Sequence, residues 1–188
     1  MSNQNRYELL ALALSYPHPE LVNAIEQGQY DKEFGQTAPF PVNLEELEVE
    51  YCRLFVGPGH VEVPPYESVY REHDIKMQQG LVMGPPAAAV SKLYREAGLQ
   101  LAQGFHDMPD HIAAETWFLA YLEAMAAHSA DGQDFLQQKR QFMDQHLGQW
   151  AGAFAEAVRK ASRHAWYIYI SKLLAETIAA ETDSSFFS

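Results

Sequence analysis

The sequence predicts an all-α globular protein, a helical bundle of about eight or nine helices in two lobes joined by a hinge near residues 98–110. Three observations support this class. Apolar residues recur at the helical spacing i, i+3, i+4, i+7 through most of the chain. The best strand candidate, His60–Val63, is short and is followed directly by Pro64. The 188 residues, 47% hydrophobic and 20% charged, suit a folded domain.

The division into lobes follows from a stretch with little hydrophobic pattern at 98–109, which contains Gly98, Gly104 and Pro109. We therefore expect one domain over 1–188. Its N-terminal lobe spans about 1–98, the hinge about 99–110 and the C-terminal lobe about 111–188.

The N-terminal half is expected to hold four helices, at about 7–14, 19–28, 43–57 and 85–97. Pro17 stops the first of them. Asn43 is typical of an N-cap, with Glu46 three positions on as its capping-box partner. Gly98 follows the fourth helix as its C′ residue.

A loop rich in proline and glycine, Gly-Pro-Gly-His-Val-Glu-Val-Pro-Pro-Tyr, occupies 57–66. For residues 67–84 we expect a helical turn and then a loop around Gly80 and Gly84. Loops like the one at 57–66, rich in proline and glycine within a helical domain, are often functional. Tyr66 and Tyr70 could offer rings with polar tips, while Glu62 and Glu67 supply carboxylates. The alternative is a structural crossover whose tyrosines pack on the core.

The C-terminal half is expected to hold four helices, at about 110–128, 132–146, 149–161 and 164–181. Asp131 is the candidate cap of the second one. The tail from Thr182 to Ser188 is expected to be frayed.

The start of the 110–128 helix carries three side chains of chemical interest. Asp110 sits where a carboxylate caps free N–H groups. His111 and Glu115 share one face, at the end of an apolar stripe, and we expect all three to be half-buried. They could hold a partner's backbone or basic side chain. The alternatives are a purely structural brace, a metal site, and a general acid–base pair.

Several functional classes are disfavoured. No further metal ligands can be placed, and no nucleophile or phosphate-binding motif occurs, so we expect no catalytic residue, metal or cofactor. A net charge of -12 argues against nucleic-acid binding. The single cysteine, Cys52, fits a reducing compartment. The absence of a secretory signal and of a long apolar run predicts a cytoplasmic protein without stable membrane insertion.

Three stretches resemble the TorD/DmsD family of redox-enzyme maturation chaperones. The first joins Tyr51–Pro58 to Pro64–Tyr70 and resembles the family's Y-x-x-L-F…P-P-Y-x-S-x-Y pattern. The second, Pro109–Glu115, resembles P-D-H-[IL]-x-x-E-L at the hinge between two lobes. The third and weaker one is His146-Leu147-x-x-Trp150 with Phe154.

The resemblance implies a cytoplasmic chaperone, not an enzyme, that binds the twin-arginine leader or the apo form of a molybdopterin-containing reductase. Such a protein would assist cofactor insertion and delay export. A cationic leader suits an acidic protein, since arginine prefers a carboxylate that it can grip with two bonds. The expected client-binding residues are Tyr66, Glu67, Ser68, Tyr70, Asp110, His111 and Glu115.

Four hypotheses stay open at this point. The first is the leader-binding chaperone, and the second is a NarJ-like chaperone for a molybdoenzyme subunit that is not exported. The third is a hydrolase, metal-dependent or acid–base, built on Asp110, His111 and Glu115. The fourth is a helical adaptor without a maturation role. Both a monomer and a domain-exchanged dimer are compatible with the sequence.

Overall fold

The computed structural model describes residues 4–71, 84–99 and 107–185. These residues form ten α-helices, one π-helical turn and no strand, which confirms the predicted all-α class. The elements are α1 (Gln4–Leu14), α2 (Pro19–Glu26), α3 (Gln29–Phe34), α4 (Leu44–Tyr51), η1 (Cys52–Val56), α5 (Glu67–Arg71), α6 (Pro85–Glu96), α7 (Ile112–His128), α8 (Gly132–Gln145), α9 (Leu147–Ala161) and α10 (Ala165–Ser185). None of the described helices is both long enough and apolar enough to cross a membrane.

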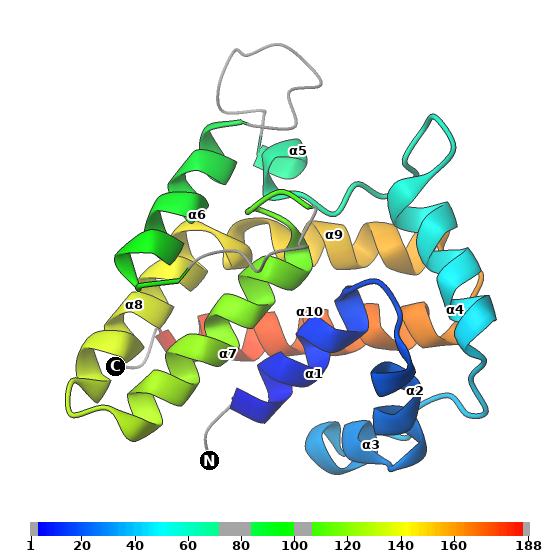
Figure 1. The fold of residues 1–188 in the computed structure, drawn as a ribbon, viewed down its shortest axis with the longest axis horizontal. Coiled ribbons are helices and arrows are strands. Elements are labelled where there is room, and N and C mark those ends of the chain that lie inside the picture. The colour runs from blue at the N-terminus through cyan, green and yellow to red at the C-terminus, as the bar shows by residue number, and fades with distance from the viewer. Residues whose placement is uncertain (1–3, 72–83, 100–106, 186–188) are drawn as a thin grey trace.

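The helices form two layers in the view of Figure 1. The helices α1 and α7 pack against each other in front, and α9 and α10 run side by side behind them. Helix α8 connects the layers at one end by packing on both α7 and α9. At the upper edge, α5 packs on α6 and α9. The short α5 therefore lies where segments from both halves of the chain meet.

One hydrophobic cluster joins these layers, with residues from both sides of the 100–106 gap. Its largest fully buried side chains are aromatic and include Trp150, Trp166, Tyr7, Tyr30 and Phe142. The ring of Tyr30 meets the edge of Trp166 at a centroid distance of 4.9 Å. This contact fixes the N-terminal region on α10, because a buried aromatic pair gains both burial and a favourable edge-to-face geometry.

Two predicted helix ends are confirmed in detail. The Asn43 side-chain oxygen accepts a hydrogen bond of 3.2 Å from the Glu46 backbone N–H, which caps α4. After α6, Gly98 has a φ of 76° and donates to the Arg95 carbonyl, while the Leu99 N–H donates to the Tyr94 carbonyl. This pair of bonds is a Schellman motif, which requires the left-handed conformation that glycine adopts most easily.

Other predictions were wrong in part. Helix α3 was not predicted, because six residues between two left-handed glycines, Gly28 and Gly35, are too few to show a period. Helix α10 continues to Ser185, so the frayed tail predicted from Thr182 is wrong for the residues that the structure describes. Asp131 occupies the N-cap position of α8, but its side chain makes no capping hydrogen bond.

The predicted helix over 43–57 changes character before it ends. Its last turn, η1, is π-helical, and the Gly57 N–H closes it by donating to the Cys52 carbonyl at 2.7 Å. A Cβ on Gly57 would lie 2.4 Å from the His60 carbonyl oxygen, and the φ of Gly57 is 60°. Only glycine therefore fits the point where the chain leaves the helix for the proline-rich loop.

The division into two lobes stays a prediction, because residues 100–106 of the expected hinge lie outside the described residues, as does the expected loop around Gly80.

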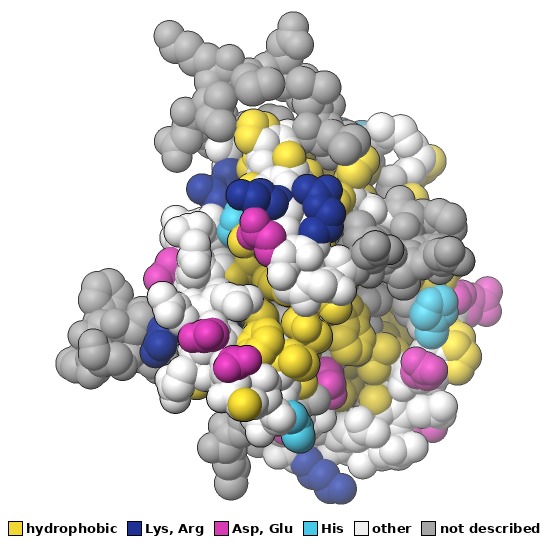
Figure 2. Space-filling view, turned by 60° about the vertical axis from the view of Figure 1, so that its left-hand side comes forward, with side chains coloured by type: hydrophobic (Ala, Val, Ile, Leu, Met, Phe, Trp, Pro, Cys, Tyr) yellow, Lys and Arg dark blue, Asp and Glu magenta, His cyan; other side chains and the backbone are white. Residues whose placement is uncertain are grey.

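Figure 2 shows the side of the molecule on which α6 and α8 lie, with hydrophobic side chains gathered below a row of Lys and Arg side chains. A cavity of about 230 Å³ lies between α6, α7 and α8. Leu93, Phe118 and Phe142 supply its apolar lining, and Glu96, Gln138 and Gln141 its polar lining.

Candidate functional site

Two segments far apart in the sequence lie against each other through their backbones. The Glu67 N–H donates to the Asp110 carbonyl at 3.0 Å, and the Ile112 N–H donates to the Pro65 carbonyl at 2.9 Å. The two bonds form an isolated antiparallel bridge between Tyr66 and His111. This bridge places the proline-rich loop and the start of α7 side by side, and with them all seven predicted site residues.

The Asp110 side chain binds α5 rather than the start of α7. Its Oδ2 accepts hydrogen bonds from the Ser68 N–H at 3.0 Å and from the Ser68 hydroxyl at 2.5 Å. Both residues are almost fully buried. Burial raises the pKa of Asp110, against the opposing effect of the bonds from Ser68. The predicted capping role of Asp110 is therefore wrong, because Ser68 occupies its carboxylate.

His111 caps α7 in place of Asp110. Its Nδ1 accepts a hydrogen bond of 3.1 Å from the Ala113 N–H, so this nitrogen carries no proton. Burial lowers the pKa of His111 to about 4, which leaves the ring neutral at neutral pH. The ring also meets Tyr66 edge-on, with centroids 5.4 Å apart. His111 therefore supports Tyr66 as a neutral aromatic group.

Glu67 is the most connected carboxylate of the site. It forms an ion pair with Arg71 on α5 and a hydrogen bond of 2.9 Å with His146 Nδ1, between α8 and α9. The same Arg71 guanidinium donates to the Gln145 carbonyl. These bonds tie α5 to the α8–α9 junction.

Glu115 lies beside Glu67 and is fully buried. Its Oε2 accepts a hydrogen bond of 3.0 Å from the indole N–H of Trp150. Burial and the charge of Glu67 raise the pKa of Glu115 well above its usual range. Burial therefore favours the neutral form of this carboxyl group.

The outer edge of the site holds two partly exposed tyrosines, Tyr66 and Tyr70. The Tyr66 hydroxyl donates to Asp107 at 3.0 Å, in an exposed position. The half-buried Tyr70 ring packs on Trp150 and Phe154, with centroid distances of 5.4 and 6.2 Å. Tyr66 and Tyr70 are thus partly exposed, and Asp107 is exposed beside Tyr66.

The prediction that Asp110, His111 and Glu115 are half-buried was wrong. Their exposed fractions are 0%, 2% and 0%, because the proline-rich loop covers the start of α7. The carboxylate of Glu62, which was predicted to be available in the loop, forms an ion pair with Arg53 at 2.6 Å.

Four further residues complete the site: Arg71, Asp107, His146 and Trp150. The signal for His146 and Trp150 was present in the weak H-L-x-x-W resemblance, which did not show that these side chains reach Glu67 and Glu115. Nothing in the sequence marks Arg71 or Asp107.

The geometry offers little to the hydrolase hypothesis. Asp110, His111 and Glu115 point to different partners, namely Ser68, the α7 backbone and Trp150. No group of three or more potential metal ligands occurs in the part of the chain that the structure describes.

Comparison with known proteins gives related chaperones. A TorD chaperone of Vibrio cholerae is 36% identical over 114 residues, which cover 59% of this chain and 49% of that protein. A TorD chaperone of Shewanella piezotolerans is 26% identical over 132 residues, or 69% of this chain and 58% of that protein. The chain spans about half the length of the curated relatives it matches.

A solved structure shares the fold. It is the crystal structure of a protein from Archaeoglobus fulgidus that is described as a redox enzyme maturation protein. The TM-score is 0.63 at 23% identity, and the match covers 94% of this chain and 93% of the other.

The model of the family described as "Nitrate reductase delta subunit" matches residues 10–156, which is more than half of the chain. This range contains all seven predicted site residues as well as His146 and Trp150. The resemblance to the TorD chaperones is confirmed, and the chain belongs to the nitrate reductase delta subunit family.

Proposed function

We propose that the protein is a cytoplasmic chaperone for one molybdopterin-containing oxidoreductase of the DMSO or TMAO reductase type. It binds the twin-arginine leader, the apo form of the client, or both. It assists cofactor insertion and delays export until the client is mature. Family membership and the relatives named as TorD chaperones support this function.

The observation that carries the proposal is the backbone bridge between Tyr66 and His111. It joins the two stretches on which the resemblance rests and leaves an aromatic edge at the surface. We assign two roles within the seven residues. Tyr66 and Tyr70 contact the client peptide, whereas the buried residues Glu67, Ser68, Asp110, His111 and Glu115 position these rings.

Charge supports a leader as the ligand. The protein has a net charge of -12, and a twin-arginine leader carries a cationic segment followed by an apolar one. In this account the exposed Asp107 carboxylate meets an arginine, and the tyrosine rings meet the apolar segment. The neutral His111 adds no opposing charge.

Calorimetric titration with a synthetic leader peptide tests this site. Tyr66→Ala and Asp107→Asn should each weaken binding about tenfold, as expected when an interface contact worth more than about 1 kcal/mol is lost. Val49→Ala is the control, because Val49 is an exposed apolar side chain on α4. Equal affinities for all four proteins would contradict the proposed site.

A NarJ-like role is the second candidate, favoured by the description of the matching family. Its client is a molybdoenzyme subunit that stays in the cytoplasm and lacks the arginine pair. Replacing Arg-Arg by Lys-Lys in the leader peptide distinguishes the exported-client role from the NarJ-like role. The exported-client role predicts weaker binding, because lysine lacks the planar two-bond grip on a carboxylate. The NarJ-like role predicts no change.

A further inference from the structure

Two cavities lie between α6 and α8, on the side of the molecule that Figure 2 shows. The cavity of about 230 Å³ is lined by Leu93 and Glu96, in the C-terminal half of α6. The other, of about 550 Å³, is lined by Pro86 and Ala89, in the N-terminal half. Both are bounded on the opposite side by residues of α8. The two cavities therefore form one groove along α6, which we call the α6–α8 groove.

The smaller cavity suits one large apolar side chain. Leu93, Phe118 and Phe142 line it, and the two phenylalanine rings meet edge to face with centroids 4.9 Å apart. Its volume is below the range of about 300–1,000 Å³ that is typical of small-molecule sites. A single anchor residue of a protein partner fits it better. Gln138 and Gln141, also in the lining, are exposed, and their amides form no hydrogen bond with the described residues. They are available to a partner.

The exposed side of α6 carries basic residues, although the chain has a net charge of -12. Lys92 and Arg95 lie about one turn apart and are both exposed. Lys92 pairs with Glu96 at 3.6 Å, whereas Arg95 forms no ion pair with a carboxylate of the described residues. Arg71 lines the larger cavity, together with the opposing carboxylate of Asp144. Figure 2 shows Lys and Arg side chains in a row above the hydrophobic ones. This row favours a negatively charged partner.

We propose that the α6–α8 groove docks an acidic amphipathic helix of another protein. An apolar side chain of this helix enters the smaller cavity against Phe118 and Phe142, and its carboxylates pair with Lys92 and Arg95. The guanidinium of Arg95 can grip a carboxylate with two bonds. Helix α6 has 12 residues and is about 18 Å long, so a partner helix of about three turns would lie along it. This surface goes beyond the proposed function and does not rest on it.

Charge and symmetry disfavour two other occupants of the groove. A cationic leader would bring like charges against Lys92 and Arg95. A second copy of this chain can offer its acidic helix α4, where Val49 is exposed beside Glu45 and Glu46. That contact joins two different surfaces, so each added copy leaves another groove open and the copies form rings or chains. An acidic helix on another protein requires no such repetition.

Fluorescence anisotropy with two synthetic helical peptides tests the charge preference. The acidic probe has one Leu flanked by Glu residues, and the basic probe has Lys in place of each Glu. The wild-type protein should bind the acidic probe about tenfold more tightly. Lys92→Glu combined with Arg95→Glu should reverse this preference. Lys32→Glu combined with Arg163→Glu is the control, because it makes the same change in net charge at exposed positions outside the groove. Equal affinities of the wild type for both probes would overturn the proposal.

A variant that fills the smaller cavity tests the position of the probe. Gln138→Trp should weaken binding of the acidic probe about tenfold, because the indole takes the place of the anchor side chain. Gln137→Trp is the matched control, since Gln137 is exposed on the same helix but does not line the cavity. Unchanged affinity in Gln138→Trp would place the probe elsewhere. The leader peptide should bind Gln138→Trp as it binds wild type, and a loss of leader binding would contradict a separate surface.

Crosslinking in cells identifies the natural occupant. A photoreactive amino acid replaces Gln138, and mass spectrometry gives the sequence of the peptide that is crosslinked to it. The proposal predicts a segment of another protein in which carboxylates flank an apolar residue. The crosslink should be lost when Lys92→Glu and Arg95→Glu are added. A crosslink to a twin-arginine leader, or to α4 of a second copy, would overturn the proposal, as would the absence of any acidic segment among the crosslinked peptides.

Discussion

The indole N–H of Trp150 on α9 donates a 3.0 Å hydrogen bond to the carboxyl group of Glu115 on α7. Both side chains are buried, so water cannot replace either partner. This bond links the back layer of helices to the turn that carries Asp110 and His111. The position of the candidate site therefore depends on a contact between two helices. Glu115 and Trp150, which make this contact, are 35 residues apart in the sequence.

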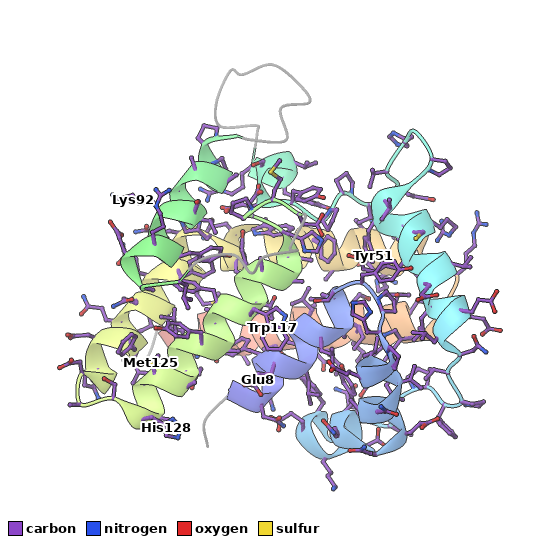
Figure 3. All side chains as sticks on the ribbon, in the orientation of Figure 1. Glu8, Tyr51, Lys92, Trp117, Met125 and His128 are labelled. Carbon is purple, nitrogen blue, oxygen red and sulfur yellow. The ribbon has the colours of Figure 1, made fainter. Side chains whose placement is uncertain are left out.

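Trp150→Phe should destabilise the protein by about 1–3 kcal/mol, because it leaves the Glu115 oxygen without its donor. Denaturant unfolding measures this loss. Trp117→Phe is the matched control, since Trp117 is the exposed tryptophan of α7, labelled in Figure 3. Its effect should stay within about 0.5 kcal/mol. Similar losses in both variants would show that the Glu115 bond contributes nothing.

Ser68→Ala should cost about 1–3 kcal/mol, because it removes a hydroxyl donor from the buried Asp110 carboxylate. The Ser129 hydroxyl accepts a longer bond of 3.2 Å in an exposed position, so Ser129→Ala should cost no more than about 0.5 kcal/mol. Thermal unfolding of the two variants measures the difference. A Ser68 variant as stable as wild type would argue that the serine does not hold α5 against Asp110.

Glu50 should make the fold sensitive to acid. Burial alone would raise the pKa of this carboxyl, but bonds from Arg53, the Arg163 N–H and the Ser162 hydroxyl lower it to about 2. Because this pKa lies below the unfolded value of about 4.5, the stabilisation is present above that value and is lost as pH falls towards 2.

Glu50→Gln should therefore flatten the acid limb of the stability profile. The missing contribution should be of the order of 1–3 kcal/mol, since solvent at the edge of the cluster screens the charges. Unfolding at a series of acidic pH values gives this profile. An unchanged acid limb in the variant would refute the assignment.

Lys139→Met should destabilise the protein by about 3–5 kcal/mol, because it leaves two carboxylates beside a buried position without their cation. Lys139 is 8% exposed and pairs with Glu123 and Glu181. Lys92, labelled in Figure 3, pairs with Glu96 at the surface, so Lys92→Met should change stability by less than about 1 kcal/mol. Calorimetric melting of both variants compares a buried pair with an exposed one.

The sequence was sufficient to predict the long helices and several of their ends. Local rules decide these features, as the Asn43 cap and the Gly98 motif show. Helix α3 was not predicted, because tertiary contacts stabilise it rather than a local sequence signal. Its buried Tyr30 donates to the Leu9 carbonyl and packs on Trp166, and both partners are distant in sequence.

The candidate site was predicted as a set of residues but not as a geometry. The motifs named Glu67, Asp110 and Glu115 as site residues, and the structure places the Glu67 and Asp110 backbones in contact. Their complete burial could not be predicted, because it depends on how the proline-rich loop folds over α7. The roles of His146 and Arg71 were missed for the same reason, since pairing with Glu67 is visible only in three dimensions.

Site-specific crosslinking in cells tests the central claim most directly. A photoreactive amino acid replaces Tyr66 in one protein and the exposed Val49 on α4 in another. The account predicts that position 66 crosslinks to the leader of a molybdenum reductase precursor and that position 49 does not. Absence of this crosslink at position 66, in cells shown to express such a precursor, would contradict the account, as would equal crosslinking at position 49.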